Sequence, residues 1–448
     1  MKRKVFDDLI IWNKKLGSKP VLLTGAKGVG KTYLAYDFAK AFFEDIKYIN
    51  LERETDIHPL FEASDINELK KNLYQYLNIK DKPSSKNSIL ILDEITFCPS
   101  AFAWLVPMLE HGIFHRIIAI SSCNFSDCRR VDDGNSGIQL SGRNITEEPA
   151  FLHIHVTPLQ FDEFLRAISK DWYIEAVMTH FESNKAIPEI VHKELMVFFE
   201  LYLQIGGMPG IVNEYLNLSS YINVPEEQGI QLSAYRDTIL KSYPESDALK
   251  MNQVLDSLAL QLLKENRKFQ YKLIRKGTTH AMYKDAIQYL ANRSNVLECF
   301  KVSTDKLPML SKEFLRKEEL RKAAGTNFKL YYQDIGLFYS RIAGEQHNPS
   351  EPMARAALLE SYVAQTLNSK DYPLLFWESD SMAKIDFLLP GVEGIVPVEL
   401  HSSGNTRSKS ISILKQKCNF TYAIKVSPKN FEFSNQVKYV PYYAVFCM

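Results

Sequence analysis

The chain lacks paired cysteines, long apolar runs and a strong net charge. Its 448 residues include only six cysteines, and no two of them are spaced as CxxC. We therefore expect reduced thiols in a cytoplasmic protein, without a disulfide framework. No segment reaches the ~20 apolar residues that a membrane-spanning helix needs, and the first residues lack the apolar core of a signal peptide. These absences predict a protein that does not bind membranes.

The balance of charge excludes a protein that is basic throughout. Lys and Arg total 54 and Asp and Glu total 53, which leaves a net charge of +1. Binding of a nucleic acid would therefore have to come from a local basic patch. Hydrophobic residues make up 46% and charged residues 24% of the chain, as in ordinary globular proteins. At about 150 residues per domain, the length predicts roughly three domains.

A strand, a glycine-rich loop and a helix are predicted near the N-terminus. The apolar run Val21–Leu23 is typical of a buried parallel strand, and the next residues have the spacing GxxxxGK[ST]. Apolar residues then recur at helical spacing from Tyr33 to Phe43. In such a P-loop, backbone N–H groups surround a phosphate chain at the positive end of the helix. The pattern predicts that ATP is bound by Gly25, Ala26, Lys27, Gly28, Val29, Gly30, Lys31, Thr32 and Tyr33.

A second apolar run, Ile89–Leu92, ends in the carboxylates that ATP hydrolysis requires. We expect Lys31 to contact the β- and γ-phosphates and the Thr32 hydroxyl to bind Mg²⁺. Asp93 would hold Mg²⁺ through water, and Glu94 would polarise the attacking water as general base. The two motifs together predict an ATPase with Lys31 and Glu94 as catalytic residues.

Two further polar segments could serve the same site. The predicted strand His115–Ile120 ends in polar residues, among which Ser122 or Asn124 could sense the γ-phosphate. Arg143 follows a Ser-Gly pair, where it could act as an arginine finger or cap a helix. Both alternatives for Arg143 remain open.

The sequence resembles a family of prokaryotic AAA-type P-loop ATPases that carry a C-terminal domain of the PD-(D/E)xK nuclease-like type. The GGMP stretch ending at Pro209 and the DIGL stretch after Gln333 are its most specific parts. The resemblance implies that Pro209 packs against the adenine ring from a helical lid; a plain helix-breaking turn is the alternative. It spans nearly the whole chain, through residues 22–32, 90–94, 141–143, 157–164, 202–209, 328–337 and 360–365.

The middle of the chain has the pattern of a winged helix-turn-helix. An apolar helical stripe from Met251, a short segment 269–274, a helix His280–Ala291 and a strand Val296–Val302 follow in order. The third helix could enter a major groove of DNA. The nearby basic cluster could meet phosphates, but we favour a solvated face with intramolecular packing for it. The cluster consists of Lys264, Arg267, Lys268, Lys272, Arg275 and Lys276.

The C-terminal resemblance implies a metal site. Glu360 from a helix, Asp386 from one strand and Glu399 from the next would share Mg²⁺ or Mn²⁺. His401 stands where the family pattern has lysine, and a mostly neutral imidazole is a weaker partner for charge on a scissile phosphate. We therefore expect metal binding with little or no cleavage of nucleic acid.

These observations predict an α/β protein with an ATP-driven switch. The leading function is ATP hydrolysis that controls a nuclease-like module, with an unidentified protein as a further partner. The alternative is an ATP-gated, metal-dependent nuclease acting on DNA or RNA. The expected parts are a P-loop ATPase core in 1–155, a helical lid in 156–225, a winged helix in 226–305 and a restriction-endonuclease-like domain in 306–448.

Overall fold

The chain forms two compact units. In the computed structural model, the first unit contains Lys2–Thr157 and Asn292–Ser294, and the second contains Pro158–Ala291 and Asn295–Met448. The break at 157/158 lies two residues beyond the expected end of the ATPase core. The structure describes residues 2–15, 19–79, 87–123, 151–218, 223–310, 317–345, 347–379, 383–391 and 394–448.

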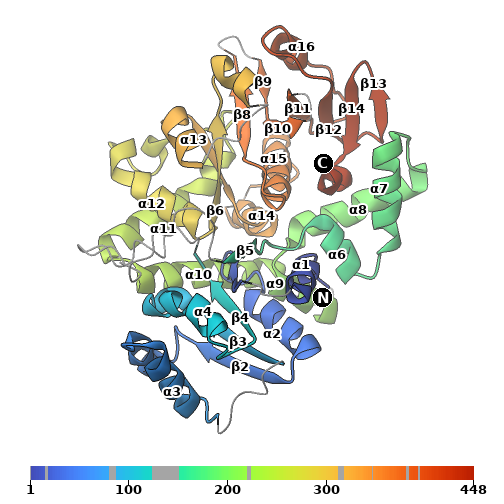
Figure 1. The fold of residues 1–448 in the computed structure, drawn as a ribbon. Helices are drawn as coiled ribbons and strands as arrows, with labels where there is room; N and C mark the ends of the chain where they lie inside the picture. Colours follow the sequence, from blue (N-terminus) through green and yellow to red (C-terminus); the bar gives the residue numbers. More distant parts are fainter. Residues whose placement is uncertain are drawn as a thin grey trace. The chain divides into compact units, whose positions relative to one another are not determined.

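The first unit is built on a parallel sheet (Figure 1). The order of its strands is β2-β3-β4-β1-β5, and every neighbouring pair is parallel. β4 therefore separates the strand before the P-loop from the strand that ends in Asp93. This arrangement confirms the predicted α/β fold with a parallel sheet. The strands are β1 (Val21–Thr24), β2 (Asp45–Asn50), β3 (Ser88–Asp93), β4 (Arg116–Ser121) and β5 (Leu152–His155).

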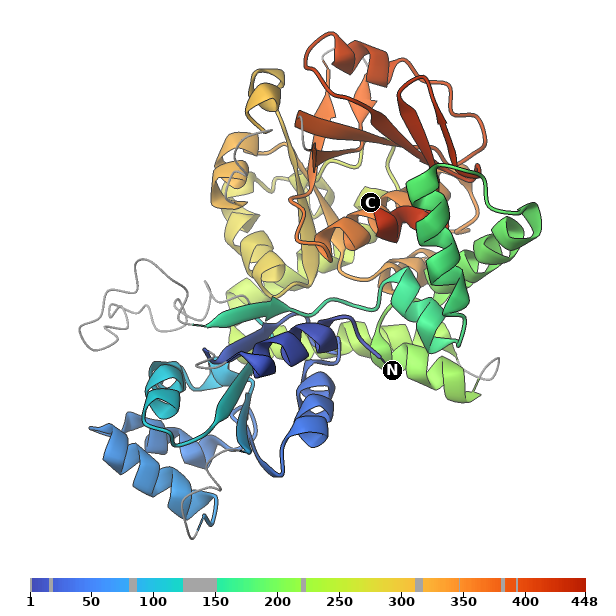
Figure 2. The same ribbon diagram turned by 45° about the vertical axis from the view of Figure 1, so that its right-hand side comes forward.

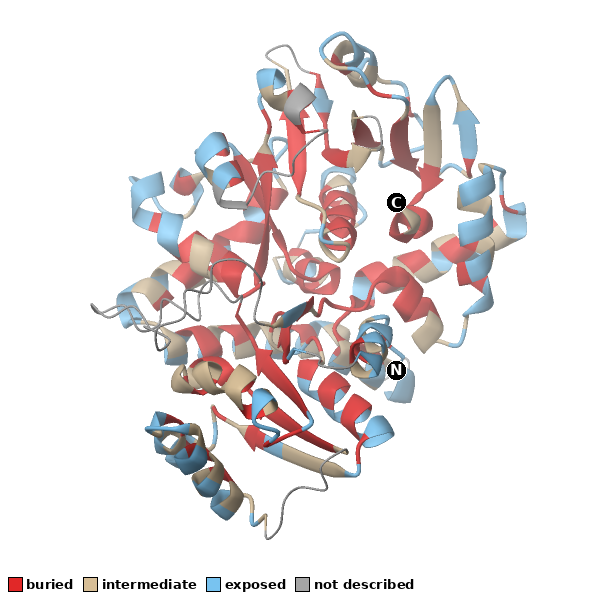
Figure 3. Cartoon of the chain, in the orientation of Figure 1, coloured by how far each residue is buried: buried red, intermediate tan, exposed pale blue. Residues whose placement is uncertain are grey.

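Helices cover the faces of this sheet because its central strands β1, β3 and β4 are apolar except at their end residues. All residues of β1, β3 and β4 are buried, as the red strands in Figure 3 show. Leu90 and Leu92 pack in one cluster with Leu69 of α3 and Leu105 of α4. Phe38 of α2 instead contacts Trp12 of α1. The helices are α1 (Val5–Lys14), α2 (Lys31–Phe42), α3 (Ile66–Tyr76) and α4 (Ser100–Glu110), with 3-10 turns η1 (Thr55–Glu62) and η2 (Ile95–Phe97).

The second unit begins with a long run of helices. Among the described residues, no single helix is long and apolar enough to span a membrane, and α8 with α9 reaches that length only as a pair bent by 116°. The helices are α6 (Phe161–Ala167), α7 (Trp172–Ser183), α8 (Glu189–Ile205), α9 (Pro209–Leu218), α10 (Val224–Ser242), α11 (Glu245–Leu262), α12 (His280–Asn292), α13 (Lys317–Ala324), α14 (Ile335–Gly344), α15 (Pro352–Asn368) and α16 (Ser410–Lys415), with 3-10 turns η4 (Tyr271–Leu273), η5 (Thr304–Met309) and η6 (Tyr442–Cys447).

Two sheets complete the second unit (Figure 2). One has the order β7-β6-β8-β9 and the other β10-β11-β12-β14-β13. Helix α15 packs against β6 and β7 of the first of these sheets. The strands are β6 (Val296–Lys301), β7 (Phe328–Tyr332), β8 (Leu375–Glu378), β9 (Lys384–Ile385), β10 (Phe387–Gly391), β11 (Gly394–Leu400), β12 (Ala423–Ser427), β13 (Glu432–Ser434) and β14 (Val437–Pro441).

The strand expected to form the wing belongs to one of these sheets. β6 pairs antiparallel with β7 and parallel with β8, so the boundary expected after residue 305 runs through a sheet. The segment 269–274 forms only the 3-10 turn Tyr271–Leu273 and no second helix. The described residues therefore do not show a separate winged-helix domain.

The strand expected to carry Asp386 is divided at that residue. β9 pairs with β8, whereas β10 pairs with β11 of the other sheet. The Asp386 N–H donates to the carbonyl of Val398 at 3.1 Å. Asp386 thus lies where the chain passes from one sheet to the next.

Candidate functional site

The predicted P-loop connects β1 to α2 with an unusual backbone. Gly25, Gly28 and Gly30 have φ angles of 145°, 90° and 88°, which L side chains rarely adopt. A Cβ atom on Gly25 would lie 2.1 Å from the carbonyl oxygen of Val156. Glycine is therefore required here for the loop to follow its path, and Lys31 begins α2 directly after the loop.

The Lys31 ammonium lies inside this loop. Its Nζ donates to the carbonyls of Gly25 at 2.9 Å and Ala26 at 3.0 Å, and to Ser122 Oγ at 3.2 Å. Burial lowers the pKa of Lys31, while the charges of Glu94 and Asp93 oppose that shift. Because carbonyl oxygens carry only partial charges, phosphate oxygens would be stronger partners for this ammonium. The arrangement fits an ammonium that would exchange its carbonyl partners for the oxygens of a bound phosphate chain.

The side chains of Thr32 and Asp93 meet as a Mg²⁺ site requires. Thr32 Oγ1 donates to Asp93 Oδ2 at 2.8 Å, which leaves the hydroxyl lone pairs available to a cation. Burial raises the pKa of Asp93, and hydrogen bonds from Tyr48 and Thr32 oppose the rise. Hydroxyl and carboxylate oxygens are the ligands that Mg²⁺ prefers. The donor set therefore fits the predicted metal.

Glu94 is held beside Lys31 by the residue predicted as a phosphate sensor. It follows β3 with a left-handed φ of 52°. Its Oε1 accepts from Ser122 Oγ at 2.5 Å, and its Oε2 accepts from the Ser122 N–H at 3.3 Å. Ser122 thus contacts both the cation and the expected general base, because β4 lies next to β3 in the sheet.

The other residues predicted for the nucleotide site have other positions or partners, or lie outside the described residues. Lys27 forms an ion pair with Glu52 at 3.8 Å, and Tyr33 is 63% exposed on α2. Pro209 begins α9 in the second unit, so its predicted contact with adenine stays a prediction. Asn124 and Arg143 lie outside the described residues.

Sequence reasoning missed one tyrosine beside the predicted Mg²⁺ ligands. The Tyr48 hydroxyl donates to Asp93 Oδ2 at 2.7 Å. Burial raises the pKa of Tyr48 to about 12, so the hydroxyl keeps its proton at neutral pH. The only signal in the sequence is the alternation in β2, which places Tyr48 and Asn50 on one face of a strand.

Four of the stretches that carry the family resemblance converge in a polar junction within the second unit. We define this junction as Leu159, Tyr202, Gly207, Asp334 and Gln365. Gly207 accepts from the Leu159 N–H at 2.7 Å, and the Tyr202 hydroxyl donates to the Leu159 carbonyl at 2.7 Å. Gln365 Nε2 donates to the Tyr202 hydroxyl at 2.8 Å. Each stretch therefore supplies a buried partner to another stretch that is distant in the sequence.

Asp334 is the centre of the junction. Its Oδ2 accepts from the Gly207 N–H at 2.7 Å, and its Oδ1 accepts from the N–H groups of Gly336 and Leu337 at 3.0 and 3.3 Å. Burial raises the pKa of Asp334 to about 6, although these three donors oppose the rise. A Cβ atom on Gly206 would lie 2.2 Å from Asp334 Oδ1, so glycine is needed for this close approach.

The C-terminal carboxylates border a cavity of about 810 Å³, whose lining includes Glu360, Asp386 and His401. Glu360 is 2% exposed, and protein donors occupy both of its oxygens. Oε1 accepts from Lys329 Nζ at 2.7 Å and the Tyr331 hydroxyl at 2.6 Å. Arg267 donates to Oε2 at 3.0 Å. Burial would raise the pKa of Glu360, but the charges of Lys329 and Arg267 lower it to about 2.

The three predicted metal ligands do not form a shared site. Glu399 Oε2 forms an ion pair with Lys425 at 3.4 Å and lies 3.3 Å from His401 Nε2, while Asp386 Oδ2 accepts from the Leu400 N–H at 2.8 Å. Within the described residues, no group of three His, Cys, Asp or Glu side chains could hold a metal ion. The expected Glu360–Asp386–Glu399 site does not fit a metal here, because Lys329 and Arg267 already neutralise Glu360 and Lys425 pairs with Glu399.

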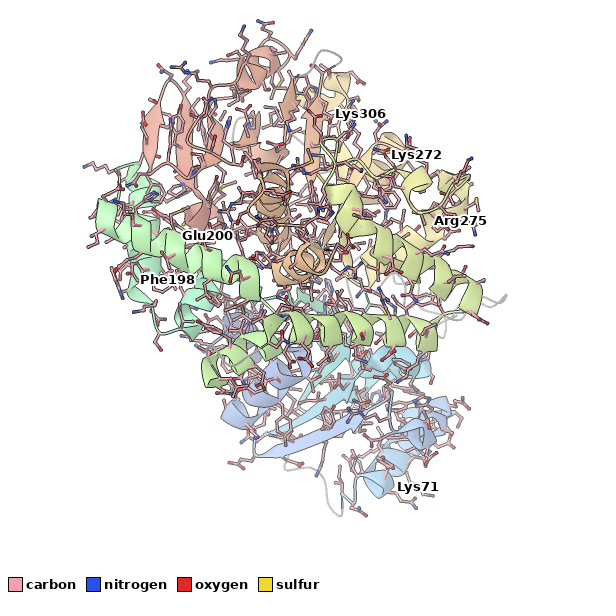
Figure 4. All side chains as sticks on the ribbon, turned by 180° about the vertical axis from the view of Figure 1, so that it is seen from behind. Lys71, Phe198, Glu200, Lys272, Arg275 and Lys306 are labelled. Atoms are coloured by element: carbon pink, nitrogen blue, oxygen red, sulfur yellow. The ribbon has the colours of Figure 1, made fainter. Side chains whose placement is uncertain are left out.

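The residues of the basic cluster that could meet phosphates differ in burial and in their partners. Arg267 is buried against Glu360, and Lys268 forms an ion pair with Glu378. Lys272 and Arg275 are exposed, and Figure 4 shows their side chains after α11. Part of the cluster therefore serves internal packing.

Comparison with known families divides the chain into three matched regions. Residues 17–165 match the model of an AAA domain family. Residues 197–347 and 355–445 match two domains of unknown function, DUF8612 and DUF4143. No curated protein matches the sequence.

Solved structures with a similar arrangement include the Walker-type ATPase Paby2304 of Pyrococcus abyssi, at 14% identity and a TM-score of 0.41, covering 76% of this chain and 93% of that one. The Orc1 protein of Aeropyrum pernix in complex with DNA has 13% identity and a TM-score of 0.29, covering 77% and 91%. PCH-2 of C. elegans has 13% identity and a TM-score of 0.25, covering 52% and 66%. Likenesses with TM-scores this low carry no argument about function. The family match and the geometry around Lys31 and Asp93 support a P-loop ATPase domain of the AAA type in residues 17–165.

Proposed function

We propose that the chain is an ATP-driven switch in which nucleotide turnover changes the state of the C-terminal pocket. The observation that carries the proposal is the hydrogen-bonded series from Lys31 through Ser122 to Glu94. Through Ser122, it joins the cation expected to bind the phosphates to the expected general base. A chain that only bound ATP would have no need of a base at this position.

The roles of the first unit follow from these contacts. Lys31 would leave its carbonyl partners for the β- and γ-phosphates, and Thr32 with Asp93 would hold Mg²⁺. Bound Mg²⁺ would neutralise charge that develops on the phosphate oxygens. When Lys31 moves, Ser122 loses one of its two partners, so the position of Glu94 becomes sensitive to the γ-phosphate. Glu94 would then accept a proton from the attacking water.

Within the second unit, one helix connects the polar junction to the pocket. α15 carries Gln365, whose Oε1 accepts from the Ile335 N–H at 2.7 Å, and also carries Glu360 of the pocket. A shift of the GGMP turn would reach α15 through Asp334 and Gln365. The predicted nucleotide sensing by Pro209 is part of this proposal, and so is an unidentified protein or nucleic acid that reads the switch.

Hydrogen exchange in two nucleotide states tests this switch. Glu94→Gln loaded with ATP should differ from wild type loaded with ADP in the exchange rates of α15 amides, because the junction would change. Lys31→Ala is the matched control and should show no response to nucleotide. ATP turnover with identical α15 exchange in both states would contradict the switch while leaving the ATPase intact.

The alternative of an ATP-gated nuclease gains no support from the pocket. A metal-dependent nuclease needs carboxylates that are free to bind the ion, whereas Glu360 is bound to Lys329, Tyr331 and Arg267. Incubation of plasmid DNA and RNA with ATP and Mn²⁺ should therefore give no cleavage. Cleavage that is lost in Asp386→Ala would support the alternative.

A further inference from the structure

The carboxylate of Asp93 is held by more than the P-loop. Strands β2 and β3 are parallel, and their register places Asn50 opposite Asp93. Tyr48 lies two residues earlier in β2 and therefore on the same face as Asn50. Its hydroxyl reaches Asp93 Oδ2 at 2.7 Å, on the oxygen that also accepts from Thr32. Strand β2 thus holds the Asp93 carboxylate through Tyr48, in addition to Thr32 at the end of the P-loop.

The hydrogen bonds around Tyr48 define the direction of its proton. Asn50 Nδ2 donates to the Tyr48 oxygen at 3.3 Å, and an amide NH₂ group can only donate. The phenol proton is therefore directed at Asp93. The Tyr48 ring also packs edge-on against Tyr36 of α2, with the ring centroids 6.4 Å apart. Tyr48 is 36% exposed, and these two contacts hold its phenol beside Asp93.

A phenol suits this position because it is neutral. A lysine or arginine would pair with Asp93 and cancel the charge that attracts a divalent cation, as Lys329 and Arg267 do at Glu360. Tyrosine orients the carboxylate and leaves its charge in place. Groups that orient a metal ligand in this way affect metal affinity by about 10- to 100-fold.

We propose that Tyr48 is a positioning residue for the Mg²⁺ site, acting through the carboxylate of Asp93. This inference rests on the proposed ATPase function and adds a residue that the P-loop and the Asp-Glu pair do not include. It assigns to β2 a part in metal affinity, separate from the binding of the nucleotide itself.

The test compares Tyr48→Phe with wild type and with Tyr36→Phe. Mn²⁺ binding to the ADP complex is measured by electron paramagnetic resonance, and metal-free ADP binding by calorimetry. Tyr48→Phe should weaken Mn²⁺ binding by about 10-fold or more and leave metal-free ADP binding within about twofold. Tyr36→Phe removes a hydroxyl from the neighbouring ring but keeps the Tyr48–Asp93 bond, so its Mn²⁺ affinity should match that of wild type.

A double variant separates positioning from packing. In an Asp93→Asn background the carboxylate is absent, so Tyr48→Phe should change the Mn²⁺ dissociation constant by less than about twofold. Equal Mn²⁺ affinity in Tyr48→Phe and wild type would overturn the proposal. So would a loss of metal-free ADP binding or of folding in Tyr48→Phe, since either would show a structural role. Wild type that binds no nucleotide would instead overturn the ATPase function on which the proposal rests.

Discussion

Replacement of Lys329 by methionine tests whether a lysine takes the place of a metal in the C-terminal pocket. Lys329 is buried, and its Nζ lies 2.7 Å from Glu360 Oε1. Burial alone would lower the pKa of Lys329, but the charges of Glu360 and Asp386 outweigh it and raise the pKa. Methionine keeps most of the side-chain volume and can still contact the Phe376 ring, over which the ammonium lies. The variant therefore removes charge with little change in packing.

The expected cost follows from the charge that remains. Breaking a buried ion pair by removing one partner typically costs about 3–5 kcal/mol. Arg267 and Tyr331 still donate to Glu360, so we expect the lower end, about 3 kcal/mol. A domain of 150–250 residues loses about 2–4 °C in Tm for each kcal/mol, so the decrease in the larger second unit should be at most roughly 6–12 °C. Calorimetry or circular dichroism would measure it.

A double variant shows whether the loss comes from charge. Adding Glu360→Gln removes the carboxylate that Lys329 neutralises but leaves Arg267 without its anion. The double variant should therefore lose less Tm than the sum of the losses of the two single variants. Glu360→Gln alone should also destabilise, because it leaves two buried cations without their anion. A Tm for Lys329→Met within about 2 °C of wild type would refute this account of the pocket.

Three further predictions concern the second unit. Asp334 has a pKa of about 6 in the folded chain against 3.8 in its unperturbed state, so its contribution to stability is present below pH 3.8 and is lost as the pH rises through 6. The unfolding free energy of wild type relative to Asp334→Asn should therefore fall by up to about 3 kcal/mol between pH 4 and 7; a difference that does not vary with pH in denaturant titrations would contradict this. Gly206→Ala should destabilise the chain, because its Cβ would lie 2.2 Å from Asp334 Oδ1, and Gly210→Ala, where nothing lies within 4 Å, is the control for its Tm. Mn²⁺ should leave the Tm of Asp93→Asn unchanged, since Glu360 is already bound by cations; a rise of several degrees would show that the C-terminal carboxylates bind metal.

The sequence was informative where the chemistry is carried by contiguous residues. The P-loop needs glycines and a lysine within one short stretch, so its pattern predicted both the strand-loop-helix order and the position of Lys31. The run ending in Asp93 predicted a buried strand for the same reason. Tyr48 could not be found in this way, because its role depends on the register between β2 and β3.

The second unit shows what sequence patterns miss. The sequence showed that His401 stands where the family pattern has a lysine. No pattern around His401 or Glu360 indicated that Lys329 of β7 would reach Glu360. The sequence pattern predicted β6 as the strand of a wing. Its parallel partner β8 begins more than 70 residues later, so no local pattern could reveal that pairing. The DIGL stretch is readable as a helix start with Asp334 as its cap, yet its bond to Gly207 arises only from the tertiary fold.

The central claim is that Lys31 and Glu94 make the first unit an ATPase, and a comparison of ATP binding and turnover tests it most directly. Glu94→Gln should bind ATP with wild-type affinity and hydrolyse it at least about 100-fold more slowly, because general-base catalysis contributes about 10²–10⁴-fold. Lys31→Ala should lose ATP binding, since it removes a charge-assisted contact to the phosphates. Hydrolysis by Glu94→Gln at the wild-type rate would contradict the assignment of the base, and wild-type turnover no faster than that of Lys31→Ala would contradict the ATPase itself.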